Sequence, residues 1–141
     1  MPQAKLLLPY LTFSGQCEEA MKFYQSCLGG ELEIIKYKDS QKKDQYPHLQ
    51  DKVIHSSLKT SQAPILLACD DPVECEKPNA PFVNHNGYSL SVTAENVEEG
   101  LEIFNLLVSD GEVVIPFGKT HFSEGFGMLK DKYGISWMIC Q

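Results

Sequence analysis

The sequence predicts an α+β protein that is built from two copies of one βαβββ unit. The first observation is an internal repeat, in which residues 90–115 echo residues 11–35. The second is that each copy has an amphipathic helical pattern after a short apolar run, followed by a glycine, Gly30 or Gly111, and another strand-like run. The third is that each copy ends in two further strand-like runs. A repeat of this length indicates two similar units, and two units that face each other leave a cleft between them.

The elements of the first copy, which we call module one, follow from local patterns. A short apolar run ends at the turn residues Ser14 and Gly15, and apolar residues then recur at helical spacing until Gly29 and Gly30 end the helix. The expected elements are a strand at 6–13, a helix with the apolar stripe Cys17, Ala20, Met21, Tyr24, Cys27 and Leu28, a strand at 31–37, an irregular loop at 39–52, and a hairpin of strands at 53–59 and 64–69.

The second copy, which we call module two, repeats this order. Asn96 is a good helix N-cap, and Glu99 three residues later is typical of a capping box. The expected elements are a strand at 88–93, a helix with the apolar stripe Val97, Leu101, Phe104, Leu107 and Val108, a strand at 112–117, a polar loop at 118–125, and a hairpin of strands at 126–130 and 135–140.

The chain length of 141 residues predicts a single domain, residues 1–141. Within it we expect module one at about 6–70, a proline-bearing connection at 71–87, and module two at about 88–141. A chain of this length buries roughly 68–70% of its unfolded surface, so it needs neither a disulfide bond nor a metal ion to hold a core.

Composition narrows the classes of partner. The net charge of −7 opposes binding to nucleic acid, which requires a basic surface. No stretch approaches the roughly 20 apolar residues that span a bilayer, and the run at 6–8 is too short for a signal peptide, so we expect a cytoplasmic protein. The five cysteines form no Cys-x-x-Cys pair and are interpreted as buried hydrophobic residues in a reducing compartment, with Cys69 and Cys75 as candidates for reactivity.

Three blocks of the sequence resemble the PhnB-like branch of the vicinal oxygen chelate superfamily, which includes glyoxalase I, extradiol dioxygenases and bleomycin-resistance proteins. The blocks are Pro9–Phe13 with Glu18–Tyr24 and Leu28–Glu31, then His55 with Leu67–Asp70, and finally Gly125–Gly127 with Asp131–Ile139. The resemblance implies a glyoxalase-like fold of two paired βαβββ modules, with mixed sheets curved around a cleft and the helices outside. It also implies a homodimer.

Metal-using members of that superfamily hold a divalent ion through His, Gln or Glu residues of the first and last strands of each module. The corresponding positions here offer no imidazole or carboxylate, and Met138 lies near the position of the usual glutamate. The positions are Leu8–Leu11, Leu66–Ala68, Tyr88–Leu90 and Trp137–Ile139. We therefore expect no metal at the usual site and no cofactor, with a divalent metal at other positions as the open alternative.

Candidate catalytic residues are His55, in the middle of a predicted strand, and His121 and Glu124, in the loop before the last hairpin. An imidazole can act as a base near neutral pH, bind an anion or join a metal site. The candidate ligand-binding residues are Tyr10, His55, Tyr88, Lys119, Phe126 and Trp137. Core packing explains the aromatic members of this set equally well.

Other ionisable residues have a simpler interpretation. His48 and His85 lie in predicted loops and are expected to be exposed. Asp70 and Asp71 either bind a cation or, more commonly for such residues, cap a loop.

Three functions are compatible with these patterns. The first is a protein that binds a small anionic or aromatic molecule in the cleft between the modules without converting it. The alternative is a divalent-metal-dependent enzyme of the superfamily, of lyase, dioxygenase or transferase type, with a rearranged site at His55, His121 and Glu124. The third is a structural or regulatory module without a small ligand.

Proteins of the PhnB-like branch are often labelled as ubiquinone-pathway methyltransferases. The sequence has no glycine-rich strand-to-helix turn of the kind that binds a nucleotide-like cofactor. Its one Gly-x-Gly, Gly125–Gly127, stands at the start of a predicted strand.

Overall fold

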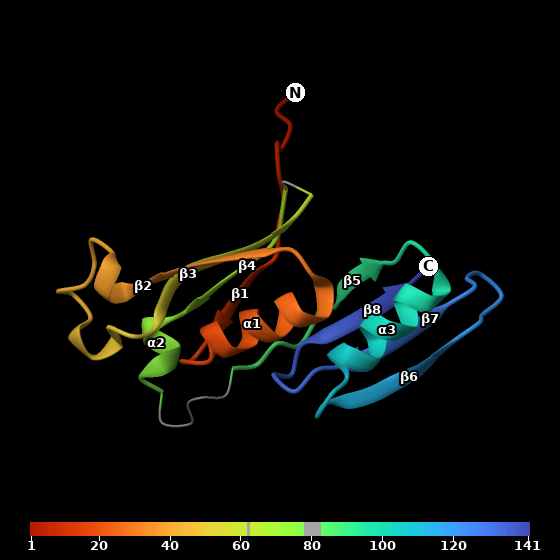
Figure 1. The fold of residues 1–141 in the computed structure, drawn as a ribbon. Helices are drawn as coiled ribbons and strands as arrows, with labels where there is room; N and C mark the ends of the chain where they lie inside the picture. Colours follow the sequence, from red (N-terminus) through yellow and green to blue (C-terminus); the bar gives the residue numbers. More distant parts are fainter. Residues whose placement is uncertain (62, 78–82) are drawn as a thin grey trace. The chain divides into compact units, whose positions relative to one another are not determined.

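The computed structural model describes residues 1–61, 63–77 and 83–141, which fold into two compact units (Figure 1). Unit 1 comprises Met1–Val83 and unit 2 comprises Asn84–Gln141. Each unit has a four-stranded mixed sheet and a long helix, so the α+β class and the two βαβββ modules are confirmed. Gln62 of the predicted hairpin turn and residues 78–82 of the predicted connection lie outside the described residues.

The sheet of unit 1 has the strand order β1-β4-β3-β2. Strand β1 runs parallel to β4, whereas the β4–β3 and β3–β2 pairs are antiparallel. The elements are β1 (Tyr10–Phe13), α1 (Cys17–Leu28), β2 (Glu31–Lys36), the 3₁₀ helices η1 (Tyr37–Asp39) and η2 (Pro47–Leu49), β3 (Val53–Thr60), β4 (Ala63–Asp70) and the short α2 (Pro72–Cys75).

The sheet of unit 2 has the order β5-β8-β7-β6, which corresponds strand for strand to unit 1. Strand β5 is parallel to β8, and the other neighbours are antiparallel. The elements are β5 (Leu90–Thr93), α3 (Val97–Leu107), β6 (Glu112–Gly118), β7 (Phe126–Lys130) and β8 (Ser136–Cys140). The repeat found in the sequence is therefore a repeat of topology.

The glycine that both copies carry is explained by one close backbone contact. A Cβ atom at Gly30 would lie 2.5 Å from the carbonyl oxygen of Lys59, and a Cβ atom at Gly111 would lie even closer to the carbonyl oxygen of Lys130. In each sheet the residue after the glycine pairs with that same lysine. The two contacts are thus equivalent, and only a residue without a side chain allows this approach.

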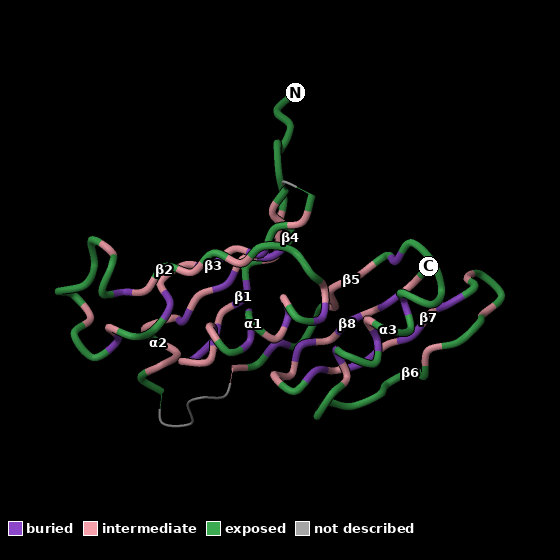
Figure 2. The backbone as a smooth tube through the Cα atoms, in the orientation of Figure 1, coloured by how far each residue is buried: buried purple, intermediate pink, exposed green. Residues whose placement is uncertain are grey.

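Each helix covers one face of the sheet in its own unit. Helix α1 contacts β2, β3 and β4, and α3 contacts β7 and β8. Figure 2 shows buried positions alternating with less buried ones along several strands, which is the pattern of a sheet with one covered face. The buried residues of α1 are Cys17, Ala20, Met21, Tyr24 and Cys27, and those of α3 are Gly100, Phe104 and Leu107. No described helix is long and apolar enough to span a bilayer.

The two long helices begin in different ways. The side chain of Asn96 accepts a hydrogen bond from the Glu99 N–H at 2.9 Å, so the predicted N-cap of α3 is confirmed. In α1 the side chain of Gln16 makes no such bond. Instead the Asp70 carboxylate, from the end of β4, accepts the N–H of Cys17 at 2.9 Å. A carboxylate at this position also complements the partial positive charge of the helix N-terminus.

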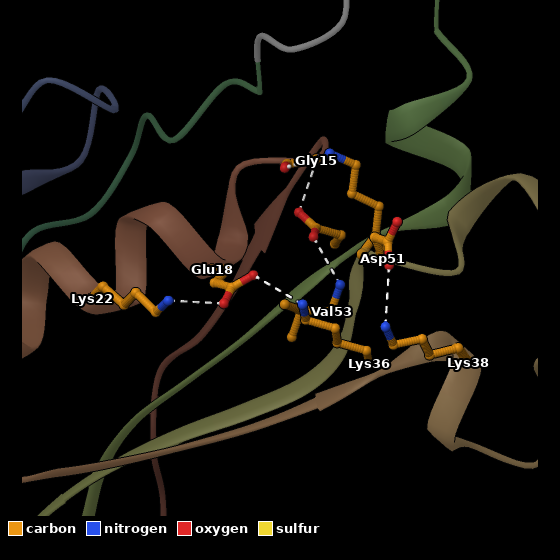
Figure 3. A network of polar contacts seen from close by, with 9 residues as sticks. Gly15, Glu18, Lys22, Lys36, Lys38, Asp51 and Val53 are labelled. Atoms are coloured by element: carbon orange, nitrogen blue, oxygen red, sulfur yellow. Dashed lines mark hydrogen bonds and ion pairs between the residues drawn. The ribbon is translucent and has the colours of Figure 1, made fainter.

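Asp70 also joins two further parts of unit 1. Its carboxylate accepts hydrogen bonds from the N–H groups of Gly15 at 2.8 Å and Val53 at 3.0 Å, and the residue is 1% exposed. Figure 3 shows the Gly15 and Val53 regions together with the Glu18 carboxylate, which lies between the ammonium groups of Lys22 and Lys36. The start of α1 is therefore attached to β2, β3 and β4 by polar contacts.

Asp71 is the N-cap of α2, so capping, one of the two roles expected for it, is the role that it has. Its side chain accepts the N–H groups of Val73 and Glu74 at the start of α2. Both aspartates of the Asp70–Asp71 pair are thus occupied by backbone donors.

The first strand of each unit is shorter than predicted. The predicted strand at 6–13 begins at Tyr10, and the predicted strand at 88–93 begins at Leu90. Pro9 can accept a hydrogen bond, from the Leu67 N–H at 3.1 Å, but has no N–H to donate. This missing donor is a physical reason for the ladder of β1 to begin only after Pro9.

Candidate functional site

Unit 1 has one sheet face that α1 does not cover. The hydroxyl of Ser56 on β3 lies 3.4 Å from the thiol of Cys17 on α1, so Ser56 faces the helix. Because side chains alternate along a strand, His55 points to the opposite face. The sheet register places Tyr10 of β1 and Cys69 of β4 on that same face. We call it the helix-free face of unit 1.

On this face the structure brings two predicted site residues into contact. The hydroxyl of Tyr10 lies 3.0 Å from Nδ1 of His55, and the ring centroids are 5.8 Å apart. Strand β4 separates β1 from β3, so the Tyr10 side chain reaches across β4. The thiol of Cys69 on β4 is close enough to the Tyr10 hydroxyl for each group to affect the pKa of the other. We call Tyr10, His55 and Cys69 the Tyr10 cluster.

Both acidic groups of the cluster hold their protons at neutral pH. Partial burial, followed by the proximity of Cys69, raises the pKa of Tyr10. Burial, followed by the charges of Asp71 and Asp70, raises the pKa of the Cys69 thiol. Burial likewise raises the pKa of Cys75 to about 11. Because the thiolate is the nucleophilic form, neither of the two cysteines flagged in the sequence has an activated thiol in this structure.

Trp137 lies on the helix-covered side of the sheet in unit 2. It is 2% exposed, and its Nε1 donates a hydrogen bond to the Asp131 carboxylate at 2.9 Å. It has the same orientation as Gly127 on the neighbouring strand, where a Cβ atom would meet the ring of Phe104 on α3. Of the two interpretations that the sequence left open for Trp137, core packing is the one that this position fits.

The candidate residues in the loop before β7 and at the start of β7 lie in two groups, one aromatic and one charged. The ring of Phe126 lies 5.3 Å from that of Phe122, which lies 5.2 Å from the His121 imidazole, both in edge-on geometry. Lys119 Nζ is 3.7 Å from the Glu124 carboxylate, and both side chains are exposed. Phe122, which is 64% exposed, was not among the predicted site residues, because one aromatic residue in a polar loop gives no periodic signal.

The three catalytic candidates are divided between the two units. His55 lies in unit 1, whereas His121 and Glu124 lie in unit 2. Their convergence in one site stays a prediction. In the described parts of the chain, no three His, Cys, Asp or Glu side chains gather in a way that would hold a metal ion.

His85 was predicted to be exposed, and this prediction is wrong, because the residue is 7% exposed. Its Nδ1 lies 3.2 Å from the hydroxyl of Tyr88, a predicted ligand-binding residue. Burial lowers the pKa of His85, and the negative charge of Asp131 offsets part of this effect. Burial, followed by Asp131, raises the pKa of Tyr88. A histidine in a loop can thus be buried when a nearby tyrosine satisfies its ring nitrogen.

Acidification should destabilise the protein through His85. Because burial lowers the folded-state pKa, the unfolded chain binds this proton more readily, so the contribution of His85 to stability is present above about pH 6.5 and is lost at lower pH. We expect the urea midpoint to fall between pH 7.5 and pH 5, and the fall to be smaller in His85→Gln. His48→Gln is the matched control, since His48 is exposed and pairs with Glu76. An unchanged pH dependence in His85→Gln would contradict this account.

A family model and a related protein each match nearly the whole chain. A family model described as 3-demethylubiquinone-9 3-methyltransferase matches residues 5–140. Protein YjdN of Escherichia coli (strain K12) is 29% identical over 136 residues, which cover 94% of this chain and 92% of YjdN.

Solved structures give the same result. Protein PA1353 from Pseudomonas aeruginosa has a TM-score of 0.80 and 32% identity, with 97% of each chain covered. A Bacillus cereus PhnB protein, described as a putative 3-demethylubiquinone-9 3-methyltransferase, has a TM-score of 0.72 and 32% identity, with 96% of this chain and 98% of that chain covered. A glyoxalase-related enzyme from Fulvimarina pelagi, at 13% identity and a TM-score of 0.63 with 97% and 88% covered, shares the fold.

Proposed function

Because the chain belongs to the PhnB-like family described as 3-demethylubiquinone-9 3-methyltransferase, which has the glyoxalase-like fold of the vicinal oxygen chelate superfamily, we propose that it binds a small anionic or aromatic molecule. The helix-free face of unit 1 supplies part of the binding surface. The observation that carries this proposal is the hydrogen bond between Tyr10 and His55 on an exposed sheet face. Tyr10 is 49% exposed, so part of its side chain remains accessible to a ligand.

The chemistry of this face fits such a ligand. A phenol ring offers a flat surface for an aromatic group, and the imidazole offers a hydrogen bond to an oxygen atom. Leu67 and Thr12, which share the face by strand alternation, add apolar contact area beside these polar groups. A few polar groups among apolar ones are typical of small-molecule sites.

The family description names a demethylubiquinone, whose flat conjugated ring carries oxygen atoms that can accept hydrogen bonds. It also names methyl transfer, which would require a methyl-donor cofactor. Gly125–Gly127 lies at the start of β7 and not at a strand-to-helix turn, so it does not have the context of a nucleotide-like binding loop. We therefore propose ligand binding without methyl transfer.

The test is a thermal-shift screen of small aromatic carboxylates and phenols, followed by titration calorimetry of the hits. His55→Leu should weaken binding about tenfold, since loss of one hydrogen bond to a ligand costs about 1.4 kcal/mol. Tyr10→Phe should also weaken binding, because it removes the hydrogen-bond partner of His55. Tyr46→Phe is the matched control, because Tyr46 lies in another part of unit 1 and its hydroxyl accepts only a 3.3 Å bond from the neighbouring Gln45 in the described structure.

Three results would argue against the proposal. The first is the absence of any binder, and the second is binding that neither variant weakens. The third is rapid conversion of a hit, or stoichiometric uptake of zinc, nickel, manganese or iron after metal-free purification. That result would favour the metal-dependent enzyme instead.

A further inference from the structure

The hydrogen bond between Tyr10 and His55 has two possible directions. A phenol has one proton to donate, and a neutral imidazole has one donor nitrogen and one acceptor nitrogen. In the first arrangement the Tyr10 hydroxyl donates to Nδ1, and the imidazole proton resides on Nε2. In the second arrangement Nδ1–H donates to the Tyr10 oxygen, and the hydroxyl turns toward the sulfur of Cys69.

The chemistry of the three groups decides between these arrangements. The raised pKa of Tyr10 keeps its hydroxyl protonated, so the hydroxyl needs an acceptor. The lone pair of an imidazole nitrogen is a strong acceptor, whereas the sulfur of a protonated thiol is a weak one. Cys69 keeps its proton because its pKa is also raised. The first arrangement is therefore favoured, and the S–H of Cys69 can complete the chain by donating weakly to the Tyr10 oxygen.

We propose that Tyr10 is a positioning residue that fixes His55 in its Nε2–H tautomer, so that the helix-free face of unit 1 presents a hydrogen-bond donor to the ligand. Nε2 of His55 has no hydrogen-bond partner among the residues that the structure describes. His55 points away from α1 and its contact with Tyr10 is exposed, so this N–H can face a bound molecule.

A fixed donor selects a class of ligand. The Nε2–H group recognises a carboxylate, a phosphonate or a ring oxygen, because each of these supplies a lone pair. It does not recognise an ammonium group, and a metal ion at Nε2 would have to displace the proton first. This selection rests on the proposed function, whereas the tautomer does not depend on any ligand.

The tautomer can be measured directly by two-bond ¹H–¹⁵N correlation spectra of the ¹⁵N-labelled protein at pH 8, with the His55 signals assigned by their loss in His55→Leu. We expect the wild-type protein to carry a proton on Nε2 of His55 and none on Nδ1, which accepts the hydrogen bond. In Tyr10→Phe the His55 signals should move toward the averaged positions of a mixed tautomer. Tyr46→Phe should leave them unchanged. A protonated Nδ1 in the wild-type protein, or identical His55 signals in Tyr10→Phe, would overturn the proposal.

The ligand class is tested with probes that share a phenyl ring but differ in charge. Benzoate and phenylphosphonate should bind at least tenfold more tightly than benzylamine, and His55→Leu should abolish this preference. Benzylamine binding as tightly as benzoate would overturn the selection of oxygen acceptors. If none of the probes binds while the tautomer is as expected, the proposed function fails and the role of Tyr10 in positioning His55 stands.

Discussion

Replacing Asp70 by alanine should lower the free energy of unfolding by about 3 to 4 kcal/mol, because each buried donor without a partner costs about 1 kcal/mol or more. The Asp70 carboxylate is the acceptor for the N–H groups of Gly15, Cys17 and Val53, and it is almost fully buried. Its loss would leave the start of α1 without its cap and detach α1 from β3. Urea unfolding followed by circular dichroism measures this change.

Two comparison variants separate the role of the carboxylate from that of its position. Asp70→Asn keeps the size of the side chain, but its amide NH₂ group would face backbone N–H donors that a carboxylate oxygen accepts in the wild-type protein. We expect its stability to lie between that of the wild type and that of Asp70→Ala. Asp71→Ala removes the cap of the short and more exposed α2, and should cost only about 1 kcal/mol. If Asp70→Ala were no more destabilising than Asp71→Ala, the central role of Asp70 would be wrong.

Adding one methyl group at either repeated glycine should destabilise the protein by about 2 to 4 kcal/mol, since the new Cβ atom meets backbone that cannot move away cheaply. In Gly30→Ala the contact is with the Lys59 carbonyl, and the positive φ of 93° adds backbone strain. In Gly111→Ala the contact is with the Lys130 carbonyl, without that additional strain. Urea midpoints of the two variants provide the measurement.

Gly118→Ala is the matched control for both glycines. Gly118 ends β6, its φ is not positive, and a Cβ atom there would meet nothing within 4 Å. We expect its free energy of unfolding to stay within about 0.5 kcal/mol of that of the wild type. Equal effects of Gly111→Ala and Gly118→Ala would contradict the close-contact explanation of the repeat.

Much of the fold could be predicted because its signals are local. The helical spacing from Cys17 to Leu28, the cap at Asn96 and the glycine before β2 and β6 each lie within one short stretch of chain. Repetition strengthened each signal, because the same pattern occurs twice. The strand bounds were less accurate where a single residue, Pro9, removes a donor from the ladder.

The candidate site depended on contacts that no local pattern contains. Tyr10 and His55 are 45 residues apart in the sequence, and they meet because β1 and β3 both pair with β4 and the Tyr10 side chain reaches across that strand. Periodicity could not tell on which face of its strand Trp137 lies, and it gave no sign that His85 would be buried against Tyr88.

The sequence by itself determined that two similar βαβββ units occur and where their helices and strands lie, because hydrophobic spacing and turn residues act over a few neighbouring positions. Only the tertiary structure decided which side chains meet on the helix-free face and which are enclosed. The register between strands settles this, and a shift of one residue would move every side chain of a strand to the opposite face.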